Sequence, residues 1–556
     1  MNNAQPLLTT EESFEAQPHD VRHLARDVLD RLVVSFTRMD GRYVPLAFYT
    51  ADVWPLAGGT TNNKKSERKL DFRRLPVRFR ATAKQMAWRY LRRGRDGGKR
   101  PKTGTLVSWL KVSSQFFAWL TERGIKRLRD VSPMVCVQYV EATKAYRSRS
   151  GKPLVAGTLA QRFLAVEAIH ELSHWTADPM PSHPWPDSSA AHLAGIPKGR
   201  AYVGKTPLIP DDLFCALFRA AWSMVQKGDY WLDLRDGLER IEVEFAHLRR
   251  RPIEVRKNKF LVESGWHAGL RSLGKQLLHL RTACYIVVAS LSGCRNHEIA
   301  YVRNDPCYST TDDEGEVYWW MKSCSDKTDE GQTEWMIPLA AVQVLKIMER
   351  WAKPFQASIE AEIVLRRKAN PDDPEIAEAM KHRDAIFLGA SNRHGNLVRT
   401  LSNNASGDML RDFLAMLGLG WEWDLTTHQF RRKFANYAAR SRYGDLRYLK
   451  EHFKHWSMDM TFGYALNESQ DLDLYLDIEA EMDSLKLGVV GEWLRDDVPL
   501  AGGFGTNIVE WRGTHPIALF KDRAAMVRSL ADSISLRSTL HAWCAADRGE
   551  CSGPEI

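Results

Sequence analysis

Three features are missing from this chain of 556 residues: paired cysteines, long apolar runs and an apolar N-terminal segment. The eight cysteines include no Cys-x-x-Cys pair, so the sequence predicts neither a zinc site nor a disulfide framework. The longest apolar runs, such as residues 285–291, are too short to cross a bilayer. Residues 1–20 are polar and acidic, unlike a secretory signal peptide. We therefore expect reduced thiols and a cytoplasmic protein that does not bind membranes.

Acidic clusters that could serve a metal-dependent nuclease are also scarce. The candidates are Asp211-Asp212 and residues 312–314, which lie in contexts typical of a helix start and a turn. The sequence therefore predicts no metal site and no cofactor. The net charge is +9 and the pI is near 9.0, which favours a polyanionic partner.

Much of the positive charge is concentrated in residues 64–102. This stretch holds 16 Lys or Arg residues against three acids, with aromatic residues between them. Clustered cations of this kind neutralise phosphates and release counterions, so we expect contact with a DNA backbone. The alternative is an ordinary solvated surface.

A second group of polar residues lies near the C-terminal end, in Thr427-His-Gln-Phe-Arg-Arg-Lys-Phe-Ala435 and beyond it. The spacing predicts a helix that carries His428 and Arg431 on one face. His455 and Tyr464 follow at short intervals. Two histidines, an arginine and a tyrosine suit the attack of a tyrosine hydroxyl on a phosphodiester. Taken singly, each of these residues is more typical of a solvated helix face or of ordinary packing.

Two upstream segments add three further candidates. An apolar helix over 283–291 runs into Gly293, which is followed by Arg295 and Glu298. Residues 316–321 and 334–338 are strand-like and flank a turn with Lys327 at its tip, which predicts a hairpin. Arg295 and Glu298 alone are more typical of a surface salt bridge.

Attack of a tyrosine on a phosphodiester needs the residue types found in these segments. A free tyrosine has a pKa near 10, so nearby cations must favour the phenolate or accept its proton. Two arginines offer planar donor forks to the phosphate oxygens, which gain charge in the transition state. A lysine on a hairpin supplies a proton to the leaving oxygen.

In this order and spacing, over roughly residues 205–475, the chain resembles the tyrosine recombinase (phage integrase) family. The resemblance implies a site-specific DNA recombinase or integrase of a mobile genetic element, which cuts and rejoins duplex DNA through a 3′-phosphotyrosyl intermediate. It implies a nucleoid-associated homotetramer on DNA, with possible accessory recombination proteins, and no need for metal or ATP. The implied site residues are Arg295, Glu298, Lys327, His428, Arg431, His455 and Tyr464.

In the roles that the resemblance implies, Tyr464 is the nucleophile and Lys327 the general acid. Lys322, five residues upstream, is the alternative general acid. Arg295 and Arg431 hold the phosphate, and Glu298 orients the site. The histidines contact the phosphate or assist the tyrosine. Arg432 and Lys433 depart from the family pattern, as does Lys454 before the third basic position.

The predicted fold is mainly α with a small β-hairpin or sheet (α+β). Residues 1–80 form an N-terminal extension of unknown role, with a helix expected over 21–36. A helical core-binding domain (81–185) and a linker (186–207) precede the catalytic domain. The catalytic domain covers 208–480, with insertions near 227–275 and 356–382, the second expected as a solvent-exposed helix. A C-terminal extension (481–556) includes an expected helix over 533–546.

Two other functions fit the same residues. One is a non-catalytic DNA-binding protein that keeps the recombinase fold as a scaffold. The other is a type IB topoisomerase, which uses the same chemistry without site specificity. Supercoil relaxation on arbitrary plasmids, against strand exchange at defined sites, separates the topoisomerase from the recombinase.

Overall fold

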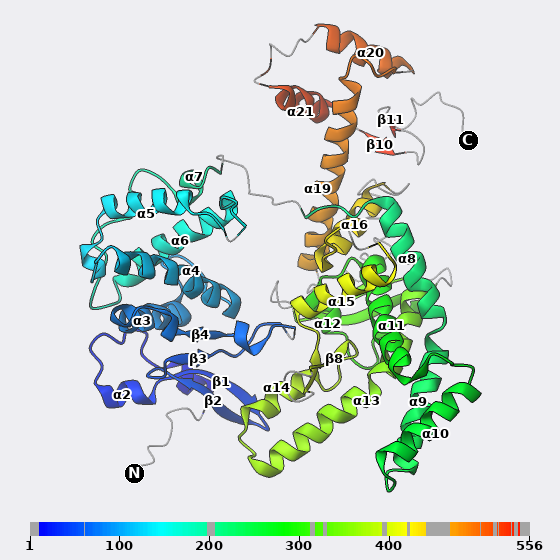
Figure 1. The fold of residues 1–556 in the computed structure, drawn as a ribbon. Helices are drawn as coiled ribbons and strands as arrows, with labels where there is room; N and C mark the ends of the chain where they lie inside the picture. Colours follow the sequence, from blue (N-terminus) through cyan, green and yellow to red (C-terminus); the bar gives the residue numbers. More distant parts are fainter. Residues whose placement is uncertain are drawn as a thin grey trace. The chain divides into compact units, whose positions relative to one another are not determined.

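The computed structural model is mostly helical and carries several small antiparallel sheets (Figure 1). This agrees with the predicted fold class. The structure describes residues 10–60, 62–148, 150–196, 206–311, 317–325, 331–391, 397–419, 423–440, 468–500, 502–514, 520, 522–534, 536–538 and 543–544. The chain divides into two compact units, residues 1–205, 354–384 and 388–402 in unit 1, and residues 206–353, 385–387 and 403–556 in unit 2.

Unit 1 begins with two small hairpins. Strands β1 (Val33–Met39) and β2 (Arg42–Phe48) pair through a turn in which Asp40 and Gly41 both have positive φ, as a tight two-residue hairpin turn requires. Strands β3 (Val53–Pro55) and β4 (Lys69–Asp71) form the second hairpin. The expected helix over 21–36 is confirmed only in its middle and is wrong on both sides of it. Only α2 (Arg26–Arg31) is helical there, because the β-branched residues that follow pair as β1.

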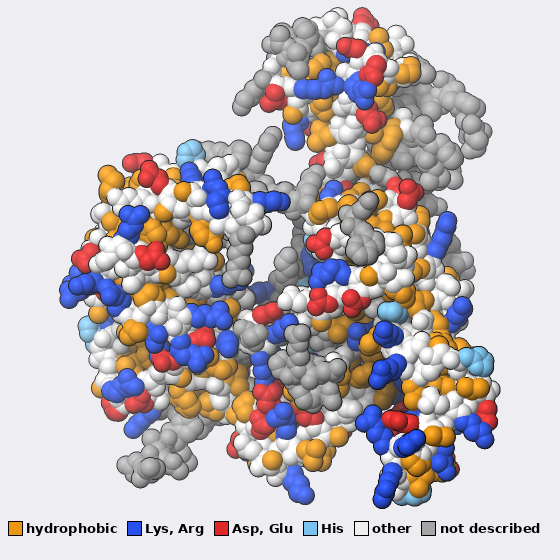
Figure 2. Space-filling model, in the orientation of Figure 1, with side chains coloured by type: hydrophobic (Ala, Val, Ile, Leu, Met, Phe, Trp, Pro, Cys, Tyr) orange, Lys and Arg blue, Asp and Glu red, His pale blue; other side chains and the backbone are white. Residues whose placement is uncertain are grey.

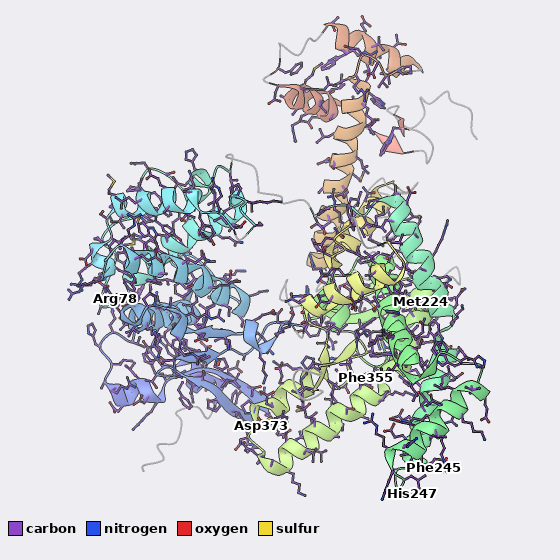
Figure 3. All side chains as sticks on the ribbon, in the orientation of Figure 1. Arg78, Met224, Phe245, His247, Phe355 and Asp373 are labelled. Atoms are coloured by element: carbon purple, nitrogen blue, oxygen red, sulfur yellow. The ribbon has the colours of Figure 1, made fainter. Side chains whose placement is uncertain are left out.

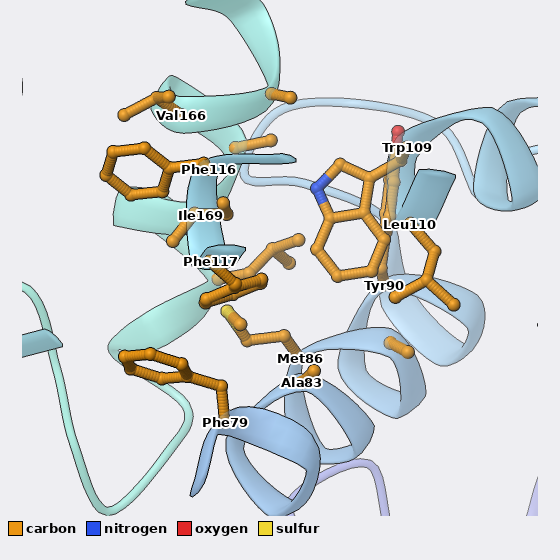
Figure 4. Close-up of a cluster of buried hydrophobic side chains, with 14 of the residues drawn as sticks. Phe79, Ala83, Met86, Tyr90, Trp109, Leu110, Phe116, Phe117, Val166 and Ile169 are labelled. Carbon is orange, nitrogen blue, oxygen red and sulfur yellow. The ribbon is translucent and has the colours of Figure 1, made fainter. Parts of the chain in front are cut away.

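The helical part of unit 1 follows the apolar spacing of the sequence. It comprises α3 (Val77–Arg93), α4 (Thr103–Glu122), α5 (Pro133–Ala145), α6 (Ala156–Ser173) and the short α7 (Ala190–Leu193). Helix α5 begins as predicted, since the Ser132 hydroxyl accepts a hydrogen bond from the amide of Val135 and Pro133 occupies the first turn. Side chains of α3, α4 and α6 interdigitate in the core (Figure 4).

The predicted boundary at residue 80 differs from the structure. It falls inside α3, and one apolar core runs from Val21 to Ala194. Trp54 and Phe72 of the hairpin region are fully buried in the same core as Phe117 and Ile169. Residues 1–80 are therefore part of the same unit as the helices, because their aromatic side chains complete its core.

A later segment of the chain completes unit 1. Helix α13 (Leu339–Ala369) continues from unit 2 into unit 1 at Pro354, and α14 (Pro374–His382), β8 (Leu388–Ser391) and β9 (Leu397–Thr400) follow it. The sequence predicted a solvent-exposed helix here. Instead, Ile359, Ile363 and Ile376 are buried. Asp373, labelled in Figure 3, caps the start of α14.

Ion pairs fasten this segment to the hairpins. Arg68 pairs with Glu378, and Lys65 pairs with Glu375. Nη1 of Arg42 lies 2.9 Å from Oδ1 of Asp372, and Nη2 of Arg367 lies 3.1 Å from Oδ1 of Asp40. These contacts explain why a segment rich in charge is not a free solvated helix.

Unit 2 is built around helix α11 (Gly269–Ser292), whose residues 280–289 are almost completely buried. Helices α8 (Asp211–Gln226), α9 (Gly228–Glu244), α10 (Arg250–Glu263), α15 (Asn403–Met416) and α16 (Thr427–Arg440) contact it. Residues 227–275, expected as an insertion, hold the α9–α10 helical hairpin, with Phe245 and His247 at its turn (Figure 3).

The predicted β-hairpin is present. Strands β6 (Val317–Ser325) and β7 (Gly331–Ile337) pair antiparallel, with Ser325 opposite Gly331. A third strand, β5 (Cys307–Thr311), pairs with β6 and extends the hairpin to three strands. In the sequence, the short helix α12 (Asn296–Ala300) follows α11 and precedes the first strand of this sheet.

The C-terminal part continues from α19 (Glu468–Trp493) into α20 (Gly502–Thr514) and α21 (Arg523–Ser533), which share a small apolar core. The predicted boundary at residue 480 falls inside α19. The helix expected over 533–546 is wrong, since α21 ends at Ser533 and β10 (Arg537–Ser538) pairs with β11 (Trp543–Cys544).

Among the described helices, none is both long enough and apolar enough to cross a membrane.

Candidate functional site

The candidate site begins at the C-terminal end of helix α11. Gly293 ends the helix in the left-handed conformation, with φ of 64°. A Cβ at this position would lie 2.6 Å from Cδ1 of Phe434 on α16. Only glycine fits, both for its φ and for its close approach to the neighbouring helix. The glycine therefore fixes how closely α11 and α16 pack.

Arg295 and Glu298 form a compact pair just beyond this glycine. The Arg295 amide donates to Oε2 of Glu298 at 2.6 Å, and the Arg295 guanidinium Nη1 donates to Oε1 at 3.1 Å. Glu298 is completely buried, and the Arg295 side chain is 12% exposed. The pair is therefore not the surface salt bridge that the spacing alone suggested. The Glu298 carboxylate caps α12 and holds both the backbone amide and the guanidinium of Arg295 from a buried position.

The three-stranded sheet is fastened to the same helix. The Ser323 hydroxyl of β6 donates to the backbone carbonyl of Glu298 at 2.5 Å. Helix α12 is also held by α11, since the Tyr285 hydroxyl donates to Oδ1 of Asn296 at 3.0 Å. Burial raises the pKa of Tyr285 far above its ordinary value, so this tyrosine acts as a structural donor.

Arg431 reaches this region from α16. Its Nη1 donates to the carbonyl oxygen of Gly293 at 3.0 Å, and its Nε donates to Oδ2 of Asp477 on α19 at 2.6 Å. The residue is 3% exposed. Its Nη2 is buried and has no hydrogen-bond acceptor among the residues that the structure describes. His428, three residues earlier on the same helix, is exposed.

The buried Cys294 thiol lies near three charged groups, Glu298, Arg295 and Arg431. Burial raises the pKa of this thiol well above its ordinary value, and the Glu298 carboxylate adds to the effect. The charges of Arg431 and Arg295 act in the opposite direction. Both guanidinium groups are therefore within electrostatic range of one buried atom. The structure brings together Arg295, Glu298 and Arg431, which lie in two distant segments of the sequence.

Three predicted site residues lie outside the described residues: Lys327, His455 and Tyr464. Lys322, the alternative to Lys327, is described. Its Nζ donates to Oδ2 of Asp305 at 2.6 Å, and its side chain is 43% exposed.

Two cations next to Arg431 have internal partners. Arg432 Nε donates to Oε1 of Glu481 on α19 at 2.6 Å. Lys433 Nζ donates to the Ile209 carbonyl at 2.9 Å and pairs with Asp211 in the first turn of α8. These contacts hold α16 between α19 and the start of α8. They also assign Asp211 a structural role.

Asp477 contacts Arg431 in the candidate site, and the sequence did not point to it. It lies thirteen residues beyond Tyr464, and the sequence holds many comparable acids there, including Asp471, Asp473 and Glu479. Helical spacing alone does not distinguish among them. The only available signal was the position of the segment directly after the expected nucleophile.

The basic stretch over 64–102 is partly neutralised within unit 1. Besides Lys65 and Arg68, six of its cations form ion pairs: Arg73 with Asp71, Lys84 with Asp52, Arg89 with Asp96, Arg92 with Glu15, Arg95 with Glu171, and Arg100 with Glu15. Figure 2 shows basic and acidic side chains interspersed over this part of unit 1. Among the described residues, Arg74, Arg78, Arg93 and Lys99 are exposed and form no ion pair. The surface available to a phosphate backbone is therefore narrower than the composition suggested.

No group of three or more His, Cys, Asp or Glu side chains with metal-binding geometry occurs in the described part of the chain. Comparison of the sequence with models of known protein families finds no match, and comparison with curated proteins finds no relative.

Proposed function

We propose that the protein is a site-specific DNA recombinase or integrase that breaks and rejoins duplex DNA through a 3′-phosphotyrosyl intermediate. The observation that carries this proposal is the hydrogen bond from Arg431 to the Gly293 carbonyl, two residues before Arg295. It joins the two segments whose arginines would hold one phosphate. A buried Arg431 donor at the same place, which has no acceptor among the described residues, supports an anionic ligand.

In this mechanism the Tyr464 hydroxyl attacks the scissile phosphorus, and its proton passes to a histidine, His428 or His455. The bond between phosphorus and the 5′-oxygen breaks, and Lys327 protonates the leaving oxygen. Arg295 and Arg431 stabilise the charge that develops on the non-bridging oxygens. Attack of a 5′-hydroxyl on the phosphotyrosine reverses the step and rejoins a strand. The energy of the broken bond is kept in the covalent link, so neither ATP nor metal is consumed.

The burial of the site supports this chemistry. Glu298 holds Arg295 from a fully buried position, and Arg431 is almost completely buried. Fixed charges in a water-poor site stabilise a developing charge more strongly than mobile charges in water do. The net charge of +9 is consistent with a duplex DNA partner. We propose that the protein acts as a homotetramer on this DNA.

The test is covalent capture of DNA. The full-length protein is incubated in EDTA with sheared genomic DNA of its source organism and stopped in SDS. Protein-linked fragments are then recovered and sequenced. A recombinase gives fragments that end at defined sites, a type IB topoisomerase gives dispersed ends, and a non-catalytic scaffold gives no covalent fragments. Strict dependence on added magnesium would contradict the proposal.

A further inference from the structure

The guanidinium of Arg431 is only partly used by the protein. Arginine offers five N–H donors. Nη1 donates to Gly293 and Nε donates to Asp477, whereas the buried Nη2 has no acceptor among the described residues. A buried donor without an acceptor costs about 1–3 kcal/mol. Its presence where α16 contacts α19 points to an acceptor that arrives with a ligand.

The other two nitrogens are held from two different elements. Gly293 belongs to the end of α11, and Asp477 belongs to α19. Because the guanidinium is planar, restraints on Nε and Nη1 fix its plane and its rotation. The direction of the Nη2 donors follows from these two contacts.

The pair formed by Arg431 and Asp477 lies at the edge of the buried region. The Arg431 side chain is 4% exposed, whereas the Asp477 side chain is 48% exposed. Substitution at Asp477 therefore leaves the apolar core untouched. The carboxylate is also accessible to solvent, so its removal does not leave a buried cavity.

We propose that Asp477 is a positioning residue, which fixes the Arg431 guanidinium so that Nη2 donates to a non-bridging oxygen of the scissile phosphodiester. This inference rests on the proposed function. Arg295 has an analogous arrangement, since Glu298 holds its Nη1 at 3.1 Å. Each arginine that holds the phosphate thus has its own carboxylate. A guanidinium that is already oriented needs no reorganisation when charge develops on the phosphate.

Asp477 links the orientation of Arg431 to helix α19. It lies thirteen residues beyond Tyr464, on the helix that follows the proposed nucleophile. The contact therefore ties the orientation of Arg431 to the docking of α19. Displacement of α19 would release Nε of Arg431 and leave the Gly293 carbonyl as its described acceptor.

The chain provides a matched control one helical turn further along α19. Glu481 accepts from Arg432 Nε at 2.6 Å, the same distance and the same nitrogen type as in the pair of Asp477 with Arg431. Arg432 is anchored to the Thr206 carbonyl instead of the Gly293 loop. Glu481→Gln therefore removes an interhelical ion pair of the same length without altering Arg431. Glu481 is more buried than Asp477, at 11% exposed, and also accepts from Nδ2 of Asn436 at 3.2 Å, so any loss of stability is expected to be larger.

The experiment compares wild type, Asp477→Asn, Asp477→Ala and Glu481→Gln on a nicked duplex bearing a site recovered by covalent capture. The duplex dissociation constant, the single-turnover rate of adduct formation and the melting temperature are measured for each. We expect unchanged duplex affinity, a rate that falls about tenfold in Asp477→Asn, and a larger fall in Asp477→Ala. Asn keeps an acceptor for Nε but loses the charge, which explains the grading. Glu481→Gln lowers the melting temperature and leaves the rate within about twofold.

Each contrary result has its own meaning. Equal rates in the wild type and both Asp477 variants would make the contact merely structural, and would overturn the inference while leaving the proposed function intact. A faster rate in Asp477→Ala would mean that the carboxylate obstructs the phosphate, and would also overturn it. If the wild type formed no adduct with any DNA, the proposed function would fail and the inference with it. The melting temperatures show whether each variant is folded, so a slow variant is not mistaken for an unfolded one.

Discussion

Nη1 of Arg431 donates to the carbonyl oxygen of Gly293 at 3.0 Å, across 138 positions of sequence. This contact places the arginine of α16 beside the loop that carries Arg295. It also makes specific demands on both partners, because the acceptor is a backbone atom of a left-handed glycine and the donor is one arm of a planar fork.

The first prediction concerns the planar guanidinium of Arg431. Arg431→Lys keeps the positive charge but cannot contact Gly293, Asp477 and a phosphate oxygen with a planar set of donors. We expect the rate of adduct formation to fall about a hundredfold, with duplex affinity little changed. Single-turnover kinetics and fluorescence anisotropy measure the two quantities. Arg432→Lys is the control, and an equal loss of rate in both variants would contradict a special role for Arg431.

The second prediction concerns the glycine. Gly293→Ala introduces a Cβ 2.6 Å from Phe434 at a φ of 64°, so we expect a loss of about 2–3 kcal/mol of stability. Gly274→Ala on the same helix is the control, since no atom lies within 4 Å of the added Cβ. This second substitution is expected to stabilise the helix by about 0.5–1 kcal/mol. Thermal unfolding of both variants measures the difference, and equal melting temperatures would refute the close packing of α11 on α16.

The third prediction distinguishes two lysines. Lys322 is engaged with Asp305, which favours Lys327 as the general acid. We expect Lys327→Ala to slow cleavage by about a hundredfold, and Lys322→Ala to change it little. A substrate with sulfur in place of the 5′-bridging oxygen needs no protonation of its leaving group, because a thiolate is a far weaker base than an alkoxide. Rescue of Lys327→Ala by this substrate tests the role, and rescue of Lys322→Ala alone would reverse the assignment.

The fourth prediction concerns pH and the ion pairs of unit 1. Burial alone would raise the pKa of Glu378, but the hydrogen bond to His382 and the charges of Arg68 and Lys381 hold it far below its ordinary value. A carboxylate whose pKa is depressed by folding stabilises the protein above its unfolded pKa, near 4.3, and loses this contribution as the pH falls. We expect Glu378→Gln to lower the melting temperature at pH 7, and the gap to the wild type to narrow between about pH 5 and pH 3. A gap that is independent of pH would contradict the ion-pair account.

Much of the fold was predictable because local signals were strong. The apolar spacing in α4 and α6 and the Ser132-Pro133 start of α5 correspond to observed helices, and the strands around Lys327 correspond to β6 and β7. These features depend on residues close together in the sequence. Glycine at position 293 likewise predicts a helix end from its own conformational freedom.

Other features depend on contacts between distant residues. Residues 1–80 join the helical core because Trp54 and Phe72 are buried there, and residues 354–384 join unit 1 through partners such as Arg68 and Glu378. Neither composition nor periodicity encodes a partner some three hundred residues away. For the same reason, the sequence indicated that Arg295, Glu298 and Arg431 belong to one site but did not identify Asp477 as the residue that holds Arg431.

The most direct test of the account is identification of the residue that becomes linked to DNA. Protein–DNA adducts captured in EDTA are digested with protease and nuclease, and the modified peptide is mapped by mass spectrometry. We predict a 3′-phosphate joined to Tyr464, a free 5′-hydroxyl on the other DNA end, and no adduct from a Tyr464→Phe variant that still binds duplex. Attachment at another residue, or equal capture by Tyr464→Phe, would contradict the assignment of the site.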